Sequence, residues 1–248
     1  MKKLLYLFLT VLIVACSSDD GNNSNDTNDG DNNQSSCPIY LDSNGVTIKA
    51  CDDANVGDTG VIDGVTYTVV DEAMLREMVE NEQDVTKVAT TKVTNMSNLF
   101  FISYDLPKSN FNQPIGNWDT SNVTDISDMF KYTTFNQNIS SWNVSSVADM
   151  GSMFEENDLF NQPIGNWDVS SVTDMGETFE QATSFNQPIG NWDVSNVIQM
   201  GSMFEEATSY NQDLSAWNVN GVTSCLYFSY EAPSWTLPQP NFTNCNPG

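Results

Sequence analysis

Phe-Asn-Gln-Pro-Ile-Gly-Asn-Trp-Asp occupies residues 111–119 and returns unchanged at residues 160–168 and 185–193. Looser copies lie at residues 135–143 and 210–218. The tryptophans of the five copies are spaced by 24, 25, 25 and 25 residues, at Trp118, Trp142, Trp167, Trp192 and Trp217. A fixed period in this range is typical of a solenoid, in which each unit packs only on its neighbours.

Each copy of the motif is preceded by apolar residues that step by three, three and one, as in the valine, methionines and phenylalanine of residues 147–154. This spacing places them on one face of a helix. A short polar residue followed three positions later by Asp or Gln, such as Ser146 and Asp149, is typical of a helix capping box. We therefore expect one helix of about ten residues in every unit.

The second half of each unit is expected to turn compactly and then extend. Trp-Asp-Val at residues 167–169 alternates inward, outward and inward, as a short strand does. Strands of successive units would stack in parallel about 4.8 Å apart, with the helices on the other side. The pattern predicts an α/β solenoid over residues 81–222, a leucine-rich-repeat-like coil of short parallel strands and short helices.

Two recurrent features of the motif have a structural and a functional interpretation. The Asn-Gln pairs can form an internal ladder that satisfies backbone groups in the turns, or they can read a ligand. The tryptophans can fill the core or stack on sugars. Their fixed period beside inward-facing valines favours the structural interpretation in both cases.

The N-terminus is typical of an exported lipoprotein. Two lysines precede an apolar run that ends at Cys16, which predicts a signal peptide over residues 1–15. The residues before Cys16 resemble a bacterial lipobox, which implies lipidation of this cysteine. Residues 16–36 are polar and acidic and are expected to be a disordered linker. Ser17, Ser18, Asp19 and Asp20 resemble the acidic export signal of Bacteroidetes lipoproteins, which implies display on the outer face of the outer membrane.

Residues 37–80 are predicted to form a cap of β-hairpins and one helix. Two β-like runs flank the turn at residues 42–45, and a second hairpin turns at Asp63-Gly64 before a helix over residues 72–80. If Asp42 pairs with Val46, Cys37 lies opposite Cys51, so that a disulfide is geometrically natural. Solenoids need such caps because a terminal repeat exposes an apolar face.

Residues 223–248 begin another unit but lack its Phe-Asn-Gln-Trp half. Cys225 stands in a methionine position, and Cys245 lies near the end. The four cysteines beyond Cys16 allow three pairings, of which we favour Cys37–Cys51 and Cys225–Cys245. The second bond would draw the tail across the open end of the coil as a C-terminal cap.

The charge of the chain limits its partners. The formal charge is −25, from 33 acidic and 8 basic residues, and no Lys or Arg follows Lys131. Such a surface repels nucleic acid and anionic lipid, so membrane contact would have to come from an anchor. The sequence has no histidine, which removes imidazole bases and most transition-metal sites. We expect no cofactor and no metal.

The best candidates for binding are polar residues around each tryptophan. The residue after it should point outward from the strand face, and an asparagine often precedes it. A polar, acidic face of this kind could hold a cation, a glycan or a basic protein, or it could simply be solvated. The candidate residues are Asp119, Asn143, Asp168, Asp193, Asn218, Asn117, Asn166 and Asn191.

Over residues 93–222, the unit combining the Val-Met-Phe half with Phe-Asn-Gln and Trp-Asp-Val resembles the repeat of BspA-type leucine-rich-repeat surface proteins. Residues 39–78 also look like the segment that often precedes such repeats. The resemblance implies cell-surface display, adhesion to host or matrix proteins in some members, and no catalytic residues. We expect a non-catalytic surface lipoprotein that binds an extracellular protein or glycan. The alternatives are a spacer or coat protein and, least favoured, a glycan hydrolase using Glu155/Glu156 or Glu205/Glu206.

Overall fold

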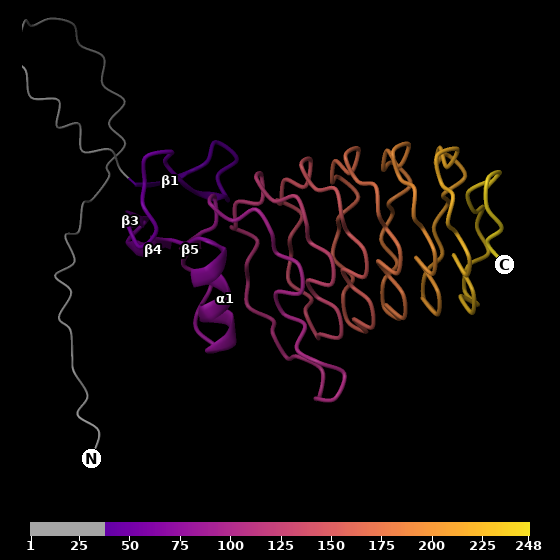
Figure 1. Cartoon of the computed structure of the whole chain (residues 1–248), viewed down its shortest axis with the longest axis horizontal. Coiled ribbons are helices and arrows are strands. Elements are labelled where there is room, and N and C mark those ends of the chain that lie inside the picture. The colour runs from indigo at the N-terminus through magenta and orange to yellow at the C-terminus, as the bar shows by residue number, and fades with distance from the viewer. Residues whose placement is uncertain (1–37) are drawn as a thin grey trace, which may run out of the picture.

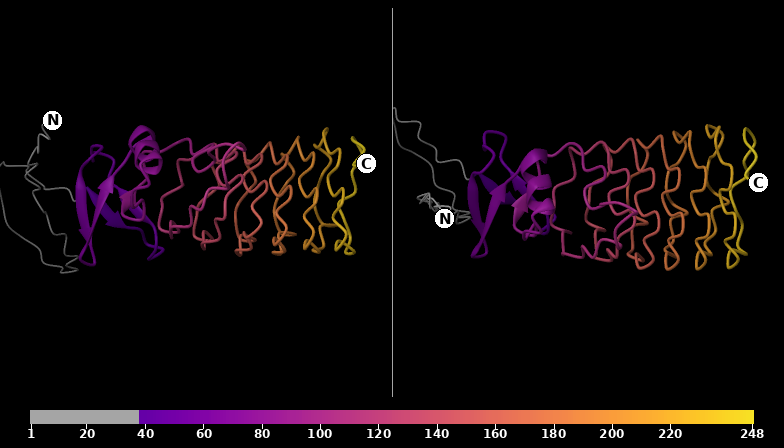
Figure 2. Two further views of the ribbon diagram at one scale, coloured as in Figure 1. Left: turned by 90° about the horizontal axis from the view of Figure 1, so that it is seen from below. Right: turned by 60° about the horizontal axis from the view of Figure 1, so that its bottom comes forward.

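The computed structural model describes residues 38–248, so the predicted signal peptide, lipid anchor and linker lie outside the described residues. The molecule is elongated. A module of short strands and one helix lies at the N-terminal end, and coils follow one another along the long axis (Figure 1). Two further views show the same succession of coils from other sides (Figure 2).

The N-terminal module contains two small sheets. Strands β1 (Ile39–Leu41) and β2 (Ile48–Ala50) pair in antiparallel fashion. Strands β3 (Thr59–Ile62) and β4 (Val65–Val69) form a second hairpin, and β5 (Val88–Ala89) adds to β4 in parallel. The turn residues Asp63 and Gly64 both have positive φ, as the twist of a two-residue hairpin requires. The second hairpin is therefore as predicted.

The first hairpin has a different register from the one expected. Leu41 lies opposite Ile48, and the Asp42 N–H donates to the Thr47 carbonyl. The Asn44 side chain accepts from the N–H groups of Val46 and Thr47, which lengthens the turn by one residue. Pro38, and not Cys37, therefore lies opposite Cys51, so the register argument for the Cys37–Cys51 bond was wrong. Cys37 lies outside the described residues, and the bond itself stays a prediction.

Helix α1 (Glu72–Glu80) begins and ends where predicted. The Asp71 side chain accepts from the Met74 N–H at 2.9 Å and caps the first turn. Leu75 is buried, and Met74, Met78 and Val79 pack partly against the coil core. Arg76 reaches the first coil, where its guanidinium donates to the Ser97 carbonyl and to Asn95 Oδ1.

The prediction of a helix in every repeat was wrong. Within residues 38–248, α1 is the only α-helix. Asn98 in the first coil and two residues of each later coil take positive φ, which ends helical winding after a single turn; the residues of the later coils fall at two positions. These residues are Asp128, Ser152, Glu177, Ser202 and Tyr227 at one position, and Tyr132, Glu156, Gln181, Glu206 and Glu231 at the other.

Alternate backbone N–H groups in this half of the unit bond to the next coil and not to their own turn. One set is Met150 to Asp174, Ser152 to Gly176, Phe154 to Thr178 and Glu156 to Glu180, at 2.8–3.0 Å. The intervening groups close four-residue turns, such as the one in which the Met153 N–H donates to the Met150 carbonyl. The chain still turns in this half of the unit, so its apolar side chains keep the spacing of a helix face. The backbone hydrogen bonds, however, join neighbouring coils.

The parallel pairing between coils also lies elsewhere than expected. Isolated parallel bridges join Asp125, Asp149, Asp174, Gln199 and Ser224 in succession. The predicted strands at Trp-Asp-Val form no strand in the described part of the chain. There the Asp or Asn side chain accepts from the N–H two residues on, for example Asp168 from Ser170, and the chain turns before a ladder can extend.

The core is built from stacked columns of aromatic rings, as the periodic tryptophans indicated. Neighbouring tryptophan rings, from Trp118 to Trp217, lie 6.3–6.5 Å apart and within 3–4° of parallel. Each indole N–H donates to the backbone of the preceding coil, as Trp167 does to the Ile139 carbonyl. All five tryptophans are at most 5% exposed, which confirms their assignment to the core.

The predicted asparagine ladder is confirmed. The Asn136 side-chain oxygen accepts from the Asn161 N–H, and the Asn161 oxygen accepts from the Asn186 N–H. Gln162 and Gln187 reinforce the ladder by donating to the asparagine of the preceding coil. These side-chain amides therefore join the turns of neighbouring coils by hydrogen bonds.

The first coil contains an insertion. Phe100 and Phe111 stack at 3.7 Å as one pair, and the corresponding pair of the next coil is Phe130 and Phe135. Residues 101–110 therefore replace a connection of four residues, and they form the magenta loop that projects below the other coils in Figure 1. We call residues 101–110 the insertion loop.

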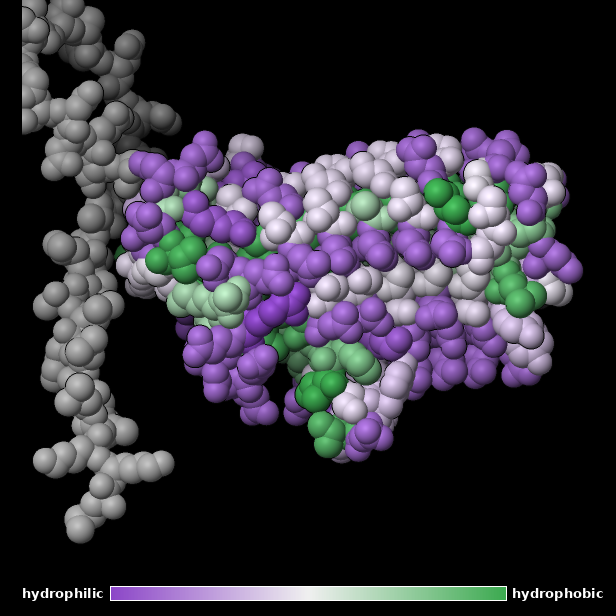
Figure 3. All heavy atoms as spheres, viewed as in Figure 1, coloured by the Kyte–Doolittle hydropathy of each residue, from purple (hydrophilic) through white to green (hydrophobic). Residues whose placement is uncertain are grey.

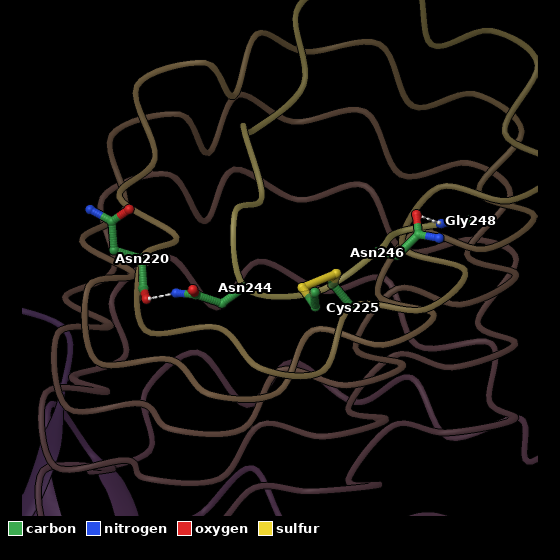
Figure 4. The surroundings of a disulfide bond; sticks show 6 residues. Asn220, Cys225, Asn244, Asn246 and Gly248 are labelled. Atoms are coloured by element: carbon green, nitrogen blue, oxygen red, sulfur yellow. Dashed lines mark hydrogen bonds between the residues drawn. A yellow bond between two sulfur atoms is a disulfide. The ribbon is translucent and has the colours of Figure 1, made fainter.

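The C-terminal segment is tied to the last coil as predicted. Cys225 and Cys245 form a disulfide, with their Cα atoms 5.9 Å apart. Asn244 donates from its side chain to the Asn220 carbonyl beside the disulfide (Figure 4). Trp235 is buried in the core, and Phe242 is partly buried against it.

We expect Tyr210→Phe to stabilise the protein by about 1–2 kcal/mol. Tyr210 is fully buried in a column whose other members are phenylalanines, and its hydroxyl has no hydrogen-bond partner among the described residues. Burial also raises the pKa of Tyr210 well above its usual range. Urea unfolding of the full chain measures the effect, with the exposed Tyr40→Phe as control. A loss of stability would show that the hydroxyl has a partner.

Candidate binding surfaces

The predicted polar row beside the tryptophans is largely occupied by local hydrogen bonds. Asp168 Oδ1 accepts from the hydroxyl and the N–H of Ser170, which hold the pKa of Asp168 below its usual range. Corresponding bonds link Asn143 to Ser145, Asp193 to Ser195, and Asn218 to Asn220. These side chains are exposed, but one oxygen of each fixes its own turn.

Asp119 is not part of that exposed row. It was expected to point outward, but it is 2% exposed and its Oδ2 accepts from Thr91 at 2.7 Å. The N-terminal module packs on the first coil there, since the Ile48 N–H donates to the Asn117 carbonyl. The Asn117 and Asn166 side chains donate to the preceding coil, to Thr86 and Ser140 respectively, and Asn191 is exposed. The eight candidates therefore do not form one uniform face.

A shallow groove of about 400 Å³ follows the column of parallel bridges. Asp149 and Asp174 line it, and the groove extends past Asp128 and Glu177. Burial raises the pKa of Asp149, and the neighbouring Asp174 and Asp125 add to the shift. Asp149 and Asp174 each accept from a glycine N–H two residues on, so the groove is a row of turn-fixing carboxylates. No group of three or more acidic, Cys or His side chains in residues 38–248 is arranged to hold a metal ion.

A second carboxylate column, at Glu155, Glu180 and Glu205, lies beside the insertion loop. Glu155 is 8% exposed, accepts from the Tyr104 hydroxyl at 2.6 Å and pairs with Lys131 Nζ at 2.7 Å. Lys131 also lies over the rings of Phe101 and Tyr104. The loop is thus fastened to the second and third coils, because Glu155 engages Tyr104 of the loop and Lys131 of the second coil.

Glu180 should make stability fall as pH rises. Its burial, with Glu155, Glu177 and Glu205 nearby, raises its pKa from 4.5 to about 7. Between these values the folded chain binds more protons than the unfolded chain, so the free energy of unfolding decreases as pH rises through this window. Because Glu180 is only half-buried, we expect Glu180→Gln to add about 1 kcal/mol at pH 8 and nothing at pH 4. Urea unfolding at both pH values measures this, with Glu206→Gln as control; an equal gain at pH 4 would contradict it.

A larger hollow than this groove lies between α1 and the insertion loop. It has a volume of about 640 Å³, and we call it the α1–loop pocket. Its apolar lining comes from α1, the first coil and the loop, and comprises Val79, Val85, Leu99, Phe100, Phe101, Ile102, Pro107 and Phe111. The insertion loop also exposes apolar side chains, with Ile102 at 63%, Leu106 at 51% and Tyr104 at 48%. Hydrophobic atoms gather on the projecting loop in Figure 3. Concave apolar sites of this size are typical ligand sites.

The cationic and anionic side chains at the α1–loop pocket differ in whether they form ion pairs within the protein. Arg76 is paired with Glu72 at 3.0 Å, and Lys108 with Asp158 at 2.5 Å, so both cations are neutralised by the protein itself. Glu80 and Glu82 also line the pocket, and neither takes part in an ion pair within the described residues. The pocket is therefore lined by eight apolar side chains and by two carboxylates that no cation within residues 38–248 neutralises.

The fold and these surfaces define a repeat protein in which, within residues 38–248, the coil with the insertion carries a pocket of about 640 Å³. The chain belongs to the family described as "Mycoplasma protein of unknown function, DUF285", whose model matches residues 71–176 and again residues 132–242. The two overlapping matches are consistent with the BspA-like repeats expected from the sequence. No curated protein and no solved structure matches the chain. Within residues 38–248, no helix is long and apolar enough to cross a membrane.

Proposed function

We propose that this chain is a non-catalytic binding module, displayed on the outer membrane by a lipid on Cys16, that holds an extracellular protein or glycan at the α1–loop pocket. The observation that carries the proposal is the pocket itself. It is concave and about 640 Å³ in volume, eight apolar residues line it, and the exposed apolar residues of the insertion loop border it. A chain that only spaced other molecules would have no use for such a pocket.

The regular coils support a scaffolding role for the remainder of the chain. Their outward amides and carboxylates are engaged in ladders and turns, as for Asn161 and Asp168. A stiff stack of this kind would hold the N-terminal module and the pocket in fixed geometry. The alternative function, a surface spacer or coat protein without a ligand, is favoured by the same self-contained faces.

An array of extracellular matrix proteins and glycans, probed with the full chain in detergent micelles, tests the proposal. We expect at least one array member to bind, and Ile102→Asp to weaken that binding at least tenfold because it places a charge at the pocket. Ile198→Asp is the matched control, since Ile198 is also exposed, at 49%, but lies on a regular coil. Absence of binding, or equal loss in both variants, would favour the spacer.

Protease shaving of intact cells tests the proposed location. Cleavage of the chain on intact cells is expected for outward display. Full protection would place the chain in the periplasm and would contradict the surface part of the proposal. A Cys16→Ser variant released from the membrane fraction would support the lipid anchor.

A further inference from the structure

The aromatic columns of the coil stack end differently at their two ends. Each coil contributes one stacked pair of rings, with centroids 3.7–4.2 Å apart, and successive pairs cover one another at 5.4–6.4 Å. Every inner pair therefore has an aromatic neighbour on both sides. Only the first and last pairs need another cover.

The C-terminal end of the columns is closed by a ring from the exit segment. Trp235 lies edge-on to Tyr210, with centroids 4.7 Å apart at 80°, and edge-on to Phe204 at 5.2 Å. Its indole N–H donates to the Gln212 carbonyl at 3.0 Å. The last pair is thus covered by an aromatic side chain that is itself fixed by a hydrogen bond.

At the N-terminal end, no aromatic ring of residues 38–99 stacks on the first pair. Phe111 is only partly buried, whereas its counterparts Phe135, Phe160 and Phe185 are fully buried. Phe100, which is 2% exposed, and Phe111 both line the α1–loop pocket, together with the aliphatic Val79 and Val85. The pocket therefore borders both the first pair of rings and α1.

We propose that the α1–loop pocket takes an aromatic side chain of a basic polypeptide partner, with the ring against the Phe100–Phe111 pair. This inference rests on the proposed binding function and names the partner's chemistry. Aromatic pairs contribute about 0.5–1.5 kcal/mol beyond the burial of their area, so a ring is preferred over an aliphatic side chain of similar size. The ring does for the first pair what Trp235 does for the last.

The basic character of the partner follows from the charges at the rim. Glu80 and Glu82 line the pocket without an ion pair in the described part of the chain, while Arg76 and Lys108 are neutralised internally. A cationic residue beside the aromatic anchor would therefore meet unpaired carboxylates. A strongly acidic partner would be repelled by Glu80 and Glu82, while Arg76 and Lys108 are already paired with Glu72 and Asp158.

The lining favours a peptide over a glycan. A sugar needs several convergent polar side chains, but Gln113 is already engaged, donating to the Gln83 carbonyl and accepting from the Val85 N–H. Eight of the seventeen lining residues are apolar, and they include both rings of the Phe100–Phe111 pair. An aromatic side chain loses little by leaving water in such a site, whereas a sugar would leave hydroxyls without partners.

Titration of the full chain with the capped tripeptides Arg-Trp-Arg, Arg-Leu-Arg and Glu-Trp-Glu tests the proposal, with ¹⁹F NMR of 5-fluorotryptophan or calorimetry as readout. We expect Arg-Trp-Arg to bind at least tenfold more tightly than either of the others. Glu80→Gln with Glu82→Gln should weaken it three- to tenfold at low salt and much less at 0.5 M salt, by screening. Glu205→Gln with Glu206→Gln, on a regular coil, is the matched control and should leave affinity unchanged.

Val79→Phe provides a second test that does not depend on removing a core residue. The added ring points to the pocket from α1, and we expect it to abolish Arg-Trp-Arg binding while leaving the free energy of unfolding unchanged or higher. Equal affinity for the leucine peptide, or failure of every peptide, would overturn the inference. Binding of a monosaccharide blocked by Val79→Phe would overturn it in favour of a glycan. If the array partner still depends on Ile102 while the peptides fail, the proposed function stands and this inference does not.

Discussion

Trp167→Ala is expected to lower the free energy of unfolding by about 3–5 kcal/mol, the cost of removing a buried aromatic side chain from a packed core. Trp167 is 4% exposed and lies between Trp142 and Trp192, with both ring centroids 6.5 Å away. Its removal leaves a cavity in a column that both neighbouring coils share. It also leaves the Ile139 carbonyl without its indole donor at 3.3 Å.

Urea unfolding of the full chain, followed by circular dichroism and by tryptophan fluorescence, measures this loss. Trp167→Phe separates its parts, because it keeps an aromatic ring but loses the N–H donor; we expect about 1–2 kcal/mol for that variant. The control is Asp168→Ala, which alters the adjacent exposed side chain and should cost about 1 kcal/mol or less. A loss below 1 kcal/mol for Trp167→Ala would contradict a continuous tryptophan column.

The damage should spread because the coils are stabilised by their neighbours. In a repeat protein, stability is approximately a sum of unit terms and interface terms. Trp167 takes part in two ring contacts, whereas Trp217 stacks on one tryptophan, Trp192. We therefore expect the central substitution to uncouple the two halves of the stack, so that circular dichroism and fluorescence no longer report one transition.

The sequence was sufficient to predict which residues lie in the core of the coils. Val147, Met150, Met153 and Phe154 are fully buried, as their spacing indicated. The same spacing could not reveal the backbone, because a helix and a chain of short turns place every third or fourth residue on the same side. Ser152 and Glu156 take positive φ without being glycine, and no local signal marks them. The choice between a helix and a chain of short turns is decided by the hydrogen bonds between coils, and no single unit contains those bonds.

The candidate binding residues were partly predictable. Period alone placed Asp168 and Asp193 at exposed positions, and it could not show that Asp119 is covered, since that depends on how the N-terminal module packs. The α1–loop pocket was missed, although the sequence carries a sign of it. Phe100 and Phe111 are eleven residues apart, while the corresponding pairs of later coils are five or six apart. An irregular spacing in one repeat marks an insertion, and insertions in repeat proteins often map to one binding face.

The two disulfide predictions differ in what supported them. Cys225 occupies a core position that the period defines, and the structure pairs it with Cys245. The Cys37–Cys51 prediction relied on a hairpin register, and the Asn44 side chain shifts that register by one residue. Long-range periodicity was therefore the more reliable guide, because it averages over many units, whereas one turn depends on a single side chain.

Replacing both Cys225 and Cys245 by serine is expected to cost about 3 kcal/mol, the loop-entropy value for a closed loop of this length, the two cysteines being 20 residues apart. The disulfide holds the tail that contains Trp235 and Phe242, and these rings cover Phe204, Tyr210 and Phe228. Without the disulfide, the tail detaches from the last coil more often. Each detachment exposes the last aromatic pair to solvent. The last coils should then become accessible to protease before the first ones.

Limited proteolysis with mass spectrometry, together with thermal unfolding, measures this effect on the full chain. Thermolysin is suitable because no Lys or Arg follows Lys131, so trypsin cannot cut there. We expect early cuts after residue 200 in the double-serine variant and a lower unfolding temperature than in the wild type. Ser229→Ala is the control, since it removes a hydroxyl from the same coil, one that bonds to Gln239, and keeps the disulfide. If the double-serine variant unfolds and is cut like this control, Trp235 and its contacts alone close the end of the stack, and the disulfide does not contribute to it.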